Sequence, residues 1–292
     1  MLNLPKNVWI LTACLALFMS LSVFMLFVGG IIGSVLAPSK SLSTLPVATI
    51  VVGTAVSIIP AIRLMSIFGR KKVFLGTCLY TILLIGLCIF SIINESFFLF
   101  SFASFCLGGN VAVMQQFRFA AIESVELEQR PLATAIVLLG GLISAYLGTE
   151  IATLGIDYFE TDFAGSFLIL ASLFVIAFIL MCFFKPAEKF KEQINKSTRP
   201  LRNIIKQGSF IVAVCAATTG YVVMSFVMTA TPVSMHVMDG FSLDHTKFVL
   251  QSHVIAMFLP SLFTAYIVKY LGLTRMMILG ILLLFVSIFT AY

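Results

Sequence analysis

Charged side chains are scarce in this chain of 292 residues, because Asp, Glu, Lys and Arg make up only 10% of the sequence while hydrophobic residues make up 60%. So few charges cannot cover the surface of a water-soluble protein of this size. The scarcity excludes the two soluble domains that the length alone would suggest. The net charge of +6 does not indicate a nucleic-acid partner, since the basic residues are confined to short segments between apolar stretches.

The sequence also lacks the patterns of several kinds of functional site. Its six cysteines include no C-x-x-C pair and have no neighbouring histidine, so neither a disulfide framework nor a zinc site is indicated. A G-x-x-x-x-G-K-[ST] phosphate-binding loop is absent, which argues against a self-contained ATP-driven pump. The histidines and aspartates within 236–245 match no strong metal-ligand spacing. We therefore predict no metal, no cofactor and no enzymatic activity, because no set of catalytic residue types converges at one membrane face.

The chain does contain a series of long apolar stretches. A transmembrane helix needs about 20 consecutive, mostly apolar residues, and each stretch approaches that length. The first stretch is too long for a signal peptide and is followed by no convincing cleavage site, so we interpret it as a span. The predicted spans are 8–34, 44–65, 73–93, 97–119, 131–153, 163–184, 209–232, 248–268 and 276–292. The predicted fold class is all-α, a polytopic membrane protein.

Basic residues are distributed unevenly between the two sides that these spans define. With the N-terminus inside, all of the 18 Lys and Arg residues except Lys40 and Lys247 fall on the cytoplasmic side. This positive-inside bias predicts a cytoplasmic N-terminus. We expect a multi-pass protein of the bacterial inner membrane, in contact with membrane lipids.

The longest polar segment, 185–207, divides the spans into six before it and three after it. We predict an N-terminal six-helix bundle over 1–184, a cytoplasmic basic linker over 185–207, and the first three helices of a C-terminal bundle over 208–292. The linker is either a surface helix on anionic lipids or a solvated tether that only sets the topology.

A short repeated turn supports two related groups of spans. Gly69, Arg70 and Lys71 follow the second predicted span, and Gly272 and Arg275 follow the eighth. Both sets place a glycine and basic residues in a tight cytoplasmic turn between apolar helices. Because the turn recurs at equivalent positions, we predict that the second and eighth spans correspond to each other.

With six spans, a basic linker, a second group of spans and this turn, the chain resembles the major facilitator superfamily of secondary transporters. The turn of that family has the form G-x-x-x-D-R-x-G-R-[RK], and Gly69, Arg70 and Lys71 match its second half. Ser66 stands at the acidic position and Ile62 at the position of the first glycine. The resemblance implies two six-helix bundles around a central cavity and a gating role for both turns.

Further stretches narrow the resemblance. The segment 140–150 keeps glycines of the G-x-x-x-G-P-x-x-G-G element found in the family's antiporters but lacks its proline, which favours uptake over export. The segments 115–121, 228–232, 251–254 and 257–261 resemble a bacterial subgroup with members linked to riboflavin uptake.

The resemblance implies a secondary active transporter that moves a small organic solute by alternating access. We expect uptake coupled to a proton, or else to another ion. Efflux of a drug or metabolite by a member of the same superfamily is the alternative within transport. Outside transport, an integral membrane enzyme and an inactive truncated remnant stay open, the latter because only three of six expected spans follow the linker.

Polar residues inside the spans are candidate transport residues, because such groups are costly in hydrocarbon and tend to face a cavity or a partner. In the fourth span, Asn110 and Arg118 fall near one helix face, with Gln115 and Gln116 between them. Arg118 would bind an anionic or carbonyl-bearing solute through its planar guanidinium group. Alternatively, Arg118 extends to the inner interface or pairs with Glu123.

Other candidates lie in the fifth, seventh and eighth spans. Glu150 is either a proton carrier or an ordinary interfacial residue. We expect Thr218 and Tyr221 in mid-membrane, where both would contact a solute. Alternatively, the threonine forms a hydrogen bond to a neighbouring helix. Gln251 and His253 would line an external entrance together with Glu150, although a histidine at that depth is alternatively a structural hydrogen-bonding residue.

Small residues recur at helical spacing in the fifth span, at positions 141, 145, 148, 152 and 155. Such a stripe lets two helices approach closely. We interpret it as a packing or sliding surface rather than a binding site.

Overall fold

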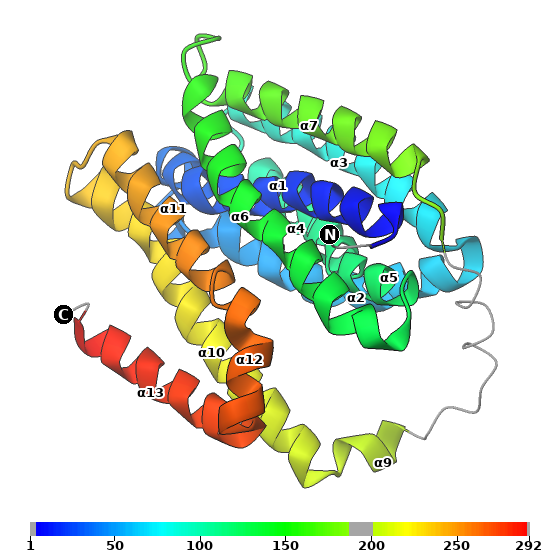
Figure 1. Cartoon of the computed structure of the whole chain (residues 1–292). Coiled ribbons are helices and arrows are strands. Elements are labelled where there is room, and N and C mark those ends of the chain that lie inside the picture. Colours follow the sequence, from blue (N-terminus) through cyan, green and yellow to red (C-terminus); the bar gives the residue numbers. More distant parts are fainter. Residues whose placement is uncertain (1–3, 187–200, 291–292) are drawn as a thin grey trace.

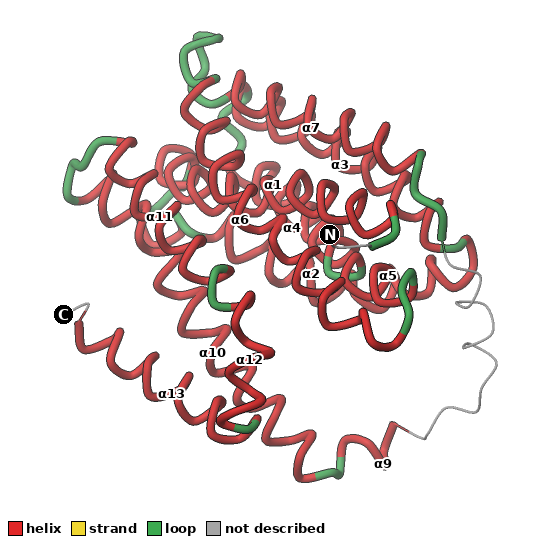
Figure 2. The backbone as a smooth tube through the Cα atoms, viewed as in Figure 1, coloured by secondary structure: helices red, strands yellow, loops and turns green. Residues whose placement is uncertain are grey.

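The computed structural model describes residues 4–186 and 201–290, which form helices joined by short turns (Figure 1). No strand occurs in this described part of the chain (Figure 2). A helix satisfies its backbone hydrogen bonds within its own segment, which is what a lipid environment requires of a spanning element.

We call residues 4–186 the first half of the molecule and residues 201–290 the second half. The first half contains α1 (Lys6–Leu36), α2 (Leu45–Phe68), α3 (Arg70–Ile93), α4 (Phe97–Met114), α5 (Phe117–Glu123), α6 (Arg130–Leu154) and α7 (Ala164–Cys182), with short turns η1 (Lys40–Leu42) and η2 (Leu127–Gln129). The second half contains α9 (Leu201–Ile205), α10 (Gly208–Pro232), the π-helical turn η3 (Val233–Met238), α11 (Leu243–Phe258), α12 (Ser261–Leu271) and α13 (Leu273–Thr290).

Seven helical stretches among the described residues are long and apolar enough to cross a membrane. They run over Lys6–Leu36, Lys40–Phe68, Arg70–Ile93, Phe97–Glu123, Leu127–Leu154, Ala164–Cys182 and Gly208–Met238. Each of them corresponds to one of the first seven predicted spans. The prediction of an all-α polytopic membrane protein is confirmed.

The eighth predicted span, 248–268, is wrong as a continuous helix. α11 ends at Phe258 and α12 begins at Ser261, with Leu259 and Pro260 in the turn between them. Proline lacks a backbone N–H and its ring clashes with the preceding helical turn, so a helix is readily interrupted there. Hydropathy did not reveal the break because the residues on both sides of it are apolar.

The ninth predicted span, 276–292, corresponds to α13. Its described apolar stretch, Leu273–Ser287, is shorter than the seven stretches above. Residues 291–292 of this span lie outside the described part of the chain.

The fourth predicted span, 97–119, contains a break at Gln115 and Gln116, between α4 and α5. The backbone angles of both residues remain near the helical region, at φ −60° and ψ −19° for Gln115 and φ −81° and ψ −13° for Gln116. The chain therefore bends there without reversing. We expected a common helix face for Asn110 and Arg118, but Asn110 is fully buried whereas Arg118 is exposed.

α1 is the centre of the first half (Figure 1). In its most apolar window 83% of the residues are buried, against 22% to 61% in the other spanning stretches of the first half. Phe18 of α1 packs against Phe117 of α5 and Phe174 of α7, with ring centroids 4.9 and 5.2 Å apart. A helix that is apolar on every side is stable only when neighbours surround it, and α1 has that position.

Close packing of α6 on α1 depends on glycine. A Cβ atom at Gly148 would lie 2.7 Å from the carbonyl oxygen of Ser20, and one at Gly140 would lie 2.6 Å from that of Thr12. Only glycine permits this approach without displacing backbone atoms. Gly148 belongs to the predicted small-residue stripe, so at this position the stripe is a packing surface.

The two ends of the molecule differ in charge. We call the end that carries Glu95, Asp157 and Asp239 the acidic end, and the end that carries Arg70 and Lys185 the basic end. Because each spanning helix runs from one end to the other, loops alternate between them.

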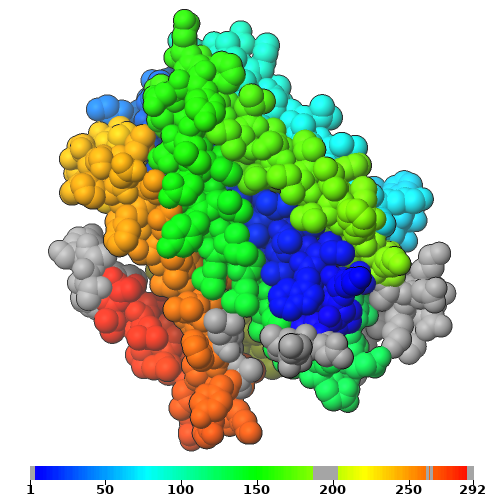
Figure 3. Space-filling model, turned by 45° about the horizontal axis from the view of Figure 1, so that its top comes forward, coloured from blue at the N-terminus to red at the C-terminus, as the bar shows by residue number. Residues whose placement is uncertain are grey.

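The second half packs on the first mainly near the acidic end. α11 lies beside α6 and α12 also borders α6, whereas α13 lies away from the first half (Figures 1 and 3). A Cβ atom at Gly30 of α1 would lie 2.7 Å from the Cγ2 atom of Val233, which begins η3. The buried residues of α10 and α11 all lie toward this end or mid-helix: Met228, Pro232, Thr246, Leu250, Gln251 and Val254. The most apolar window of α10, in contrast, contains no buried residue.

The division of the chain at 185–207 stays a prediction. Residues 187–200 of the predicted linker, on which the surface-helix and tether alternatives depend, lie outside the described part of the chain.

Candidate functional site

A cavity of about 240 Å³ lies between the two halves, and we call it the central cavity. Its walls come from α1, α2 and α4 of the first half and from α10 and α11 of the second. The lining residues are Met19, Ser22, Val23, Leu26, Val47, Ile50, Val51, Thr54, Val111, Met114, Gln115, Tyr221, Met224, Ser225, Met228, Thr229, Val254 and Met257. An apolar cavity with a few convergent polar groups is typical of a small-molecule site.

The polar groups of the central cavity are few, and no charged side chain lines it among the described residues. The Ser22 hydroxyl oxygen is buried and has no hydrogen-bond partner in the described part of the chain. Thr54, in contrast, donates to the carbonyl oxygen of Ile50 in its own helix at 2.8 Å. Gln115 reaches the cavity from the break between α4 and α5.

Of the predicted site residues, Gln115 and Tyr221 line the central cavity. Gln116, the neighbour of Gln115 at the same break, does not. Thr218 is exposed on α10 and lies outside the cavity lining. From the sequence we could assign each of these residues to a predicted span, but not decide which side of that span faces the second half.

Asn110 lies inside the first half, between α3 and α4. Its side chain is fully buried and donates to the Thr81 hydroxyl oxygen at 3.0 Å. The Asn110 carbonyl oxygen Oδ1 has no partner among the described residues. Hydrogen bonds of this kind join helices within a membrane, so the observed contact of Asn110 is structural.

Arg118 is exposed, and its guanidinium group lies over the ring of Phe119, 5.0 Å from the ring centroid. This arrangement is a cation–π contact at the surface. The alternative that Arg118 pairs with Glu123 is wrong, because Glu123 forms its ion pair with Arg70.

Arg70 and Glu123 form a bidentate ion pair near the basic end. The Arg70 Nε and Nη2 atoms donate to the two carboxylate oxygens of Glu123 at 2.9 and 2.7 Å. The side chains are only 7% and 17% exposed. Two parallel charge-assisted bonds fix the geometry of the pair, which joins the first residue of α3 to the last residue of α5. Beside it, Lys71 donates to the carbonyl oxygen of Cys182 at the end of α7.

The two predicted repeat turns share one backbone geometry. Gly69 has φ 81° and ψ 155°, and Gly272 has φ 76° and ψ 159°. In both turns the glycine N–H donates to the carbonyl oxygen four residues earlier at 2.9 Å. Only glycine adopts these angles readily, which explains why a glycine recurs. The basic residues differ, since Arg70 is buried whereas Arg275 is exposed.

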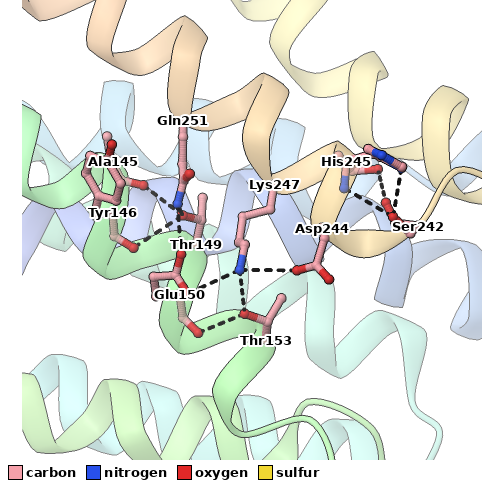
Figure 4. A network of polar contacts seen from close by, with 11 residues as sticks. Ala145, Tyr146, Thr149, Glu150, Thr153, Ser242, Asp244, His245, Lys247 and Gln251 are labelled. Atoms are coloured by element: carbon pink, nitrogen blue, oxygen red, sulfur yellow. Dashed lines mark hydrogen bonds and ion pairs between the residues drawn. The ribbon is translucent and has the colours of Figure 1, made fainter.

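A set of polar side chains joins α6 to α11 near the acidic end (Figure 4). We call Thr149, Glu150, Asp244, Lys247 and Gln251 the α6–α11 polar network. The Lys247 Nζ atom lies 3.1 Å from Glu150 Oε2 and 3.2 Å from Asp244 Oδ1. The Gln251 Nε2 atom donates to the Thr149 hydroxyl at 2.8 Å and to Glu150 Oε1 at 3.2 Å.

The α6–α11 polar network brings together two of the residues that we expected at an external entrance. Glu150 and Gln251 meet directly, and their contact ties the two halves together. His253 lies on the same helix, half-buried and outside the network. Sequence reasoning missed Lys247, which it used only as a charge that marks topology. Asp244, Lys247 and Gln251 follow each other at spacings of three and four residues, which puts them on one helix face and was a usable signal.

A second cavity, of about 790 Å³, lies at the acidic end. It is bordered by Glu95, Glu160, Asp162 and His236, among others. The cavity arises where the ends of α1 and α3 meet η3, the start of α11 and the loop between α6 and α7, which are segments distant in sequence.

Comparison with known proteins identifies the family. Residues 8–292 match the family described as Major Facilitator Superfamily. The chain belongs to this superfamily. The riboflavin transporter RfnT of Brucella anthropi is 34% identical to it over 288 residues, which cover 96% of this chain and 71% of that protein.

Two Bacillus subtilis proteins described as uncharacterized MFS-type transporters are also similar. YddS is 26% identical over 86% of this chain and 61% of its own length, and YdeG is 26% identical over 91% of this chain and 65% of its own length. The chain therefore spans between 61% and 71% of the length of these three relatives.

Membership of the major facilitator superfamily confirms the resemblance drawn from the turn and from the arrangement of spans. The chain is a transporter of this superfamily rather than an enzyme, and the alternative of an integral membrane enzyme is wrong. The second half of the superfamily turn is present here as Gly69, Arg70 and Lys71. Ser66 stands at the acidic position, and its hydroxyl donates to the carbonyl oxygen of Arg63. The carboxylate opposite Arg70 comes instead from Glu123 of α5.

Proposed function

We propose that this protein is a secondary active transporter that takes up a small organic solute across the bacterial inner membrane by alternating access. The observation that carries the proposal is the central cavity, which is lined by both halves. In alternating access, two rigid bodies move against each other around a site that lies between them. The solute would occupy the central cavity.

The packing of the molecule is consistent with such a movement. Within the first half, α1 and α6 approach so closely that a side chain at Gly148 has no space. Between the halves, contacts concentrate at the acidic end, through α6 with α11 and α1 with η3. Packed interfaces switch between discrete arrangements, so breaking this one group of contacts would open the acidic end.

The distribution of charge supplies the orientation in this proposal. Basic loops tend to remain on the cytoplasmic side of a membrane, which supports a basic end inside the cell and an acidic end outside. The described arrangement, closed at the acidic end, then corresponds to an inward-facing state. The acidic-end cavity would receive the solute from outside once the α6–α11 contact opens.

Glu150 is the proposed proton carrier. Its carboxylate faces Lys247 and Gln251 across the interface between the halves. A proton on Glu150 removes the negative charge that holds Lys247 and so weakens the closed arrangement, which would couple proton movement to opening. Riboflavin is the first solute to test, because the relative RfnT is described as a riboflavin transporter.

The test is uptake of riboflavin by the full chain in proteoliposomes, with and without an inward proton gradient. We expect saturable accumulation that the gradient stimulates. Glu150→Gln should lower the gradient-driven accumulation at least about tenfold while leaving exchange of riboflavin across the membrane, because the variant has no carboxylate at the position of the proposed proton carrier. Glu128→Gln is the matched control, since Glu128 is exposed at the basic end.

Two results would contradict parts of this proposal. Accumulation no higher than in protein-free vesicles would remove riboflavin as the solute. Full stimulation by the gradient in the Glu150→Gln variant would remove Glu150 as the proton carrier.

A further inference from the structure

Methionine is concentrated around the central cavity. Five of its 18 lining residues are methionines, whereas the whole chain of 292 residues contains only 13. They come from four helices of both halves: Met19 of α1, Met114 of α4, Met224 and Met228 of α10, and Met257 of α11. Unrelated segments therefore present the same side chain to one space.

Methionine usually serves as a flexible filler of irregular gaps in a protein core. Here the methionines surround about 240 Å³ that they leave empty, so filling the core does not explain their convergence. The thioether sulfur is polarisable and makes favourable contacts with aromatic rings, and a surface of several methionines adapts to the outline of a flat ligand.

The Ser22 hydroxyl of the cavity wall is available to a ligand. Ser20 on α1 donates to the carbonyl oxygen of Ala16 within its own helix at 2.7 Å. Ser22, two residues later, makes no such bond, and its buried hydroxyl has no partner in residues 4–186 and 201–290. Buried hydroxyls are normally satisfied, so an unsatisfied one at a cavity wall indicates a ligand or water that bonds to it.

Among the residues that the structure describes, the cavity lining carries no charged side chain, which constrains the ligand further. A charged solute would lose its hydration there without gaining an ion-pair partner, and that is strongly unfavourable. The nearby interface lysine, Lys247, is held by Glu150 and Asp244. Arg118, which we expected to bind an anionic solute, is exposed outside the cavity lining.

The volume limits the part of the solute that the cavity encloses. Sites for drug-sized molecules occupy about 300–1,000 Å³, and the central cavity, at about 240 Å³, falls below that range. It therefore fits a compact ring system, and a longer substituent would extend beyond the lining.

We infer that the central cavity selects an uncharged solute with a flat, polarisable ring system, which the methionine side chains contact on its faces and which Ser22, Gln115 and Tyr221 orient through its polar edge. The inference rests on the proposed function for the claim that this solute is transported. The binding itself is tested separately from transport.

The experiment compares two probes that share one ring. Lumichrome is an uncharged heterocycle of three fused rings, and its 8-carboxylate replaces a ring methyl group by an anionic group. Both are titrated, by fluorescence, against the full chain in lipid nanodiscs. We expect lumichrome to bind at least about tenfold more tightly than the carboxylate, and we expect Gln115→Arg to reverse this preference, because it brings a cation to the cavity.

Methionine variants test the contacts with the ring. The double substitution Met224→Leu and Met228→Leu nearly conserves volume and should weaken lumichrome binding several-fold. Met25→Leu is the matched control, because Met25 is fully buried on α1 and does not line the cavity. Thermal unfolding of each variant separates a loss of binding from a loss of folding.

The outcomes separate this inference from the proposed function. Equal affinity for both probes, or equal weakening by Met25→Leu and the double variant, overturns the inference. Tight lumichrome binding without riboflavin uptake in proteoliposomes supports the inference and contradicts the proposed uptake. Uptake of riboflavin together with equal binding of the carboxylate supports the uptake and overturns the inference.

Discussion

At the scale of single residues, the Arg70–Glu123 pair shows how the superfamily turn is completed in this chain. Arg70 is the first residue of α3 and is buried, so its charge requires compensation. The carboxylate of Glu123 supplies it from α5 through two hydrogen bonds. From the sequence we considered Arg118 as the ion-pair partner of Glu123, because the two residues are near neighbours. The partner in the structure is Arg70, 53 positions away.

Loss of the Glu123 carboxylate should destabilise the first half. Glu123→Gln removes the anion opposite a buried guanidinium group, and we expect a loss of unfolding free energy on the order of 3 kcal/mol. Arg63→Gln is the control, because Arg63 is exposed near the same end, and its effect should stay within about 0.5 kcal/mol. The measurement is the thermal or denaturant unfolding of purified protein in detergent. Equal losses in the two variants would show that the pair contributes nothing particular to stability.

At the scale of helices, most of the fold was predictable from hydropathy, because a span is a local property of about 20 residues. The first seven predicted spans correspond to the seven long apolar stretches. The break of the eighth at Pro260 was not found, since an apolar sequence continues on both sides of the proline. The bend at Gln115 and Gln116 was also missed, since apolar residues flank it on both sides. The sequence therefore did not reveal how Gln115 reaches the cavity.

Contacts between helices were less predictable than the helices themselves. The small-residue stripe of α6 indicated close packing but did not reveal which helix packs on it. At Gly148 of α6, the neighbour is the backbone of α1. The α6–α11 polar network depends on side chains about 100 positions apart, such as Gln251 and Glu150. No periodicity within one helix reports such a distant partner.

The α1–α6 contact gives a prediction at this scale. A methyl group at Gly148 would lie 2.7 Å from the Ser20 carbonyl oxygen, so Gly148→Ala should destabilise the protein by about 1–3 kcal/mol through overpacking. Gly86→Ala is the control on α3, where a Cβ atom meets nothing within 4 Å. It should be neutral or stabilise by up to about 1 kcal/mol, because alanine favours helix. The comparison is made by unfolding in detergent, and a Gly148→Ala protein as stable as the Gly86→Ala protein would refute the close contact.

At the scale of the whole molecule, the arrangement of two halves around one cavity is the feature that gives the polar residues a function. The first half is held by α1, and the second half meets it through α11 and η3 at the acidic end. Tyr221 and Gln115 belong to different halves and face the same cavity. Family membership establishes the transporter class, and the proposed alternation adds that the acidic-end contact must open and close in each cycle.

The most direct measurement of this central claim is uptake by a protein whose acidic end is held closed. Gly30 and Val233 come from different halves, and a Cβ atom at Gly30 would lie 2.7 Å from Val233 Cγ2, so cysteines at both positions are within disulfide reach. The pair Gly30→Cys and Val233→Cys, placed in a background without the six native cysteines, is oxidised in proteoliposomes and assayed for riboflavin uptake. Each single substitution serves as a control. The account predicts that oxidation stops uptake in the double variant only and that reduction restores it, whereas undiminished uptake with the disulfide formed would contradict alternating access through the acidic end.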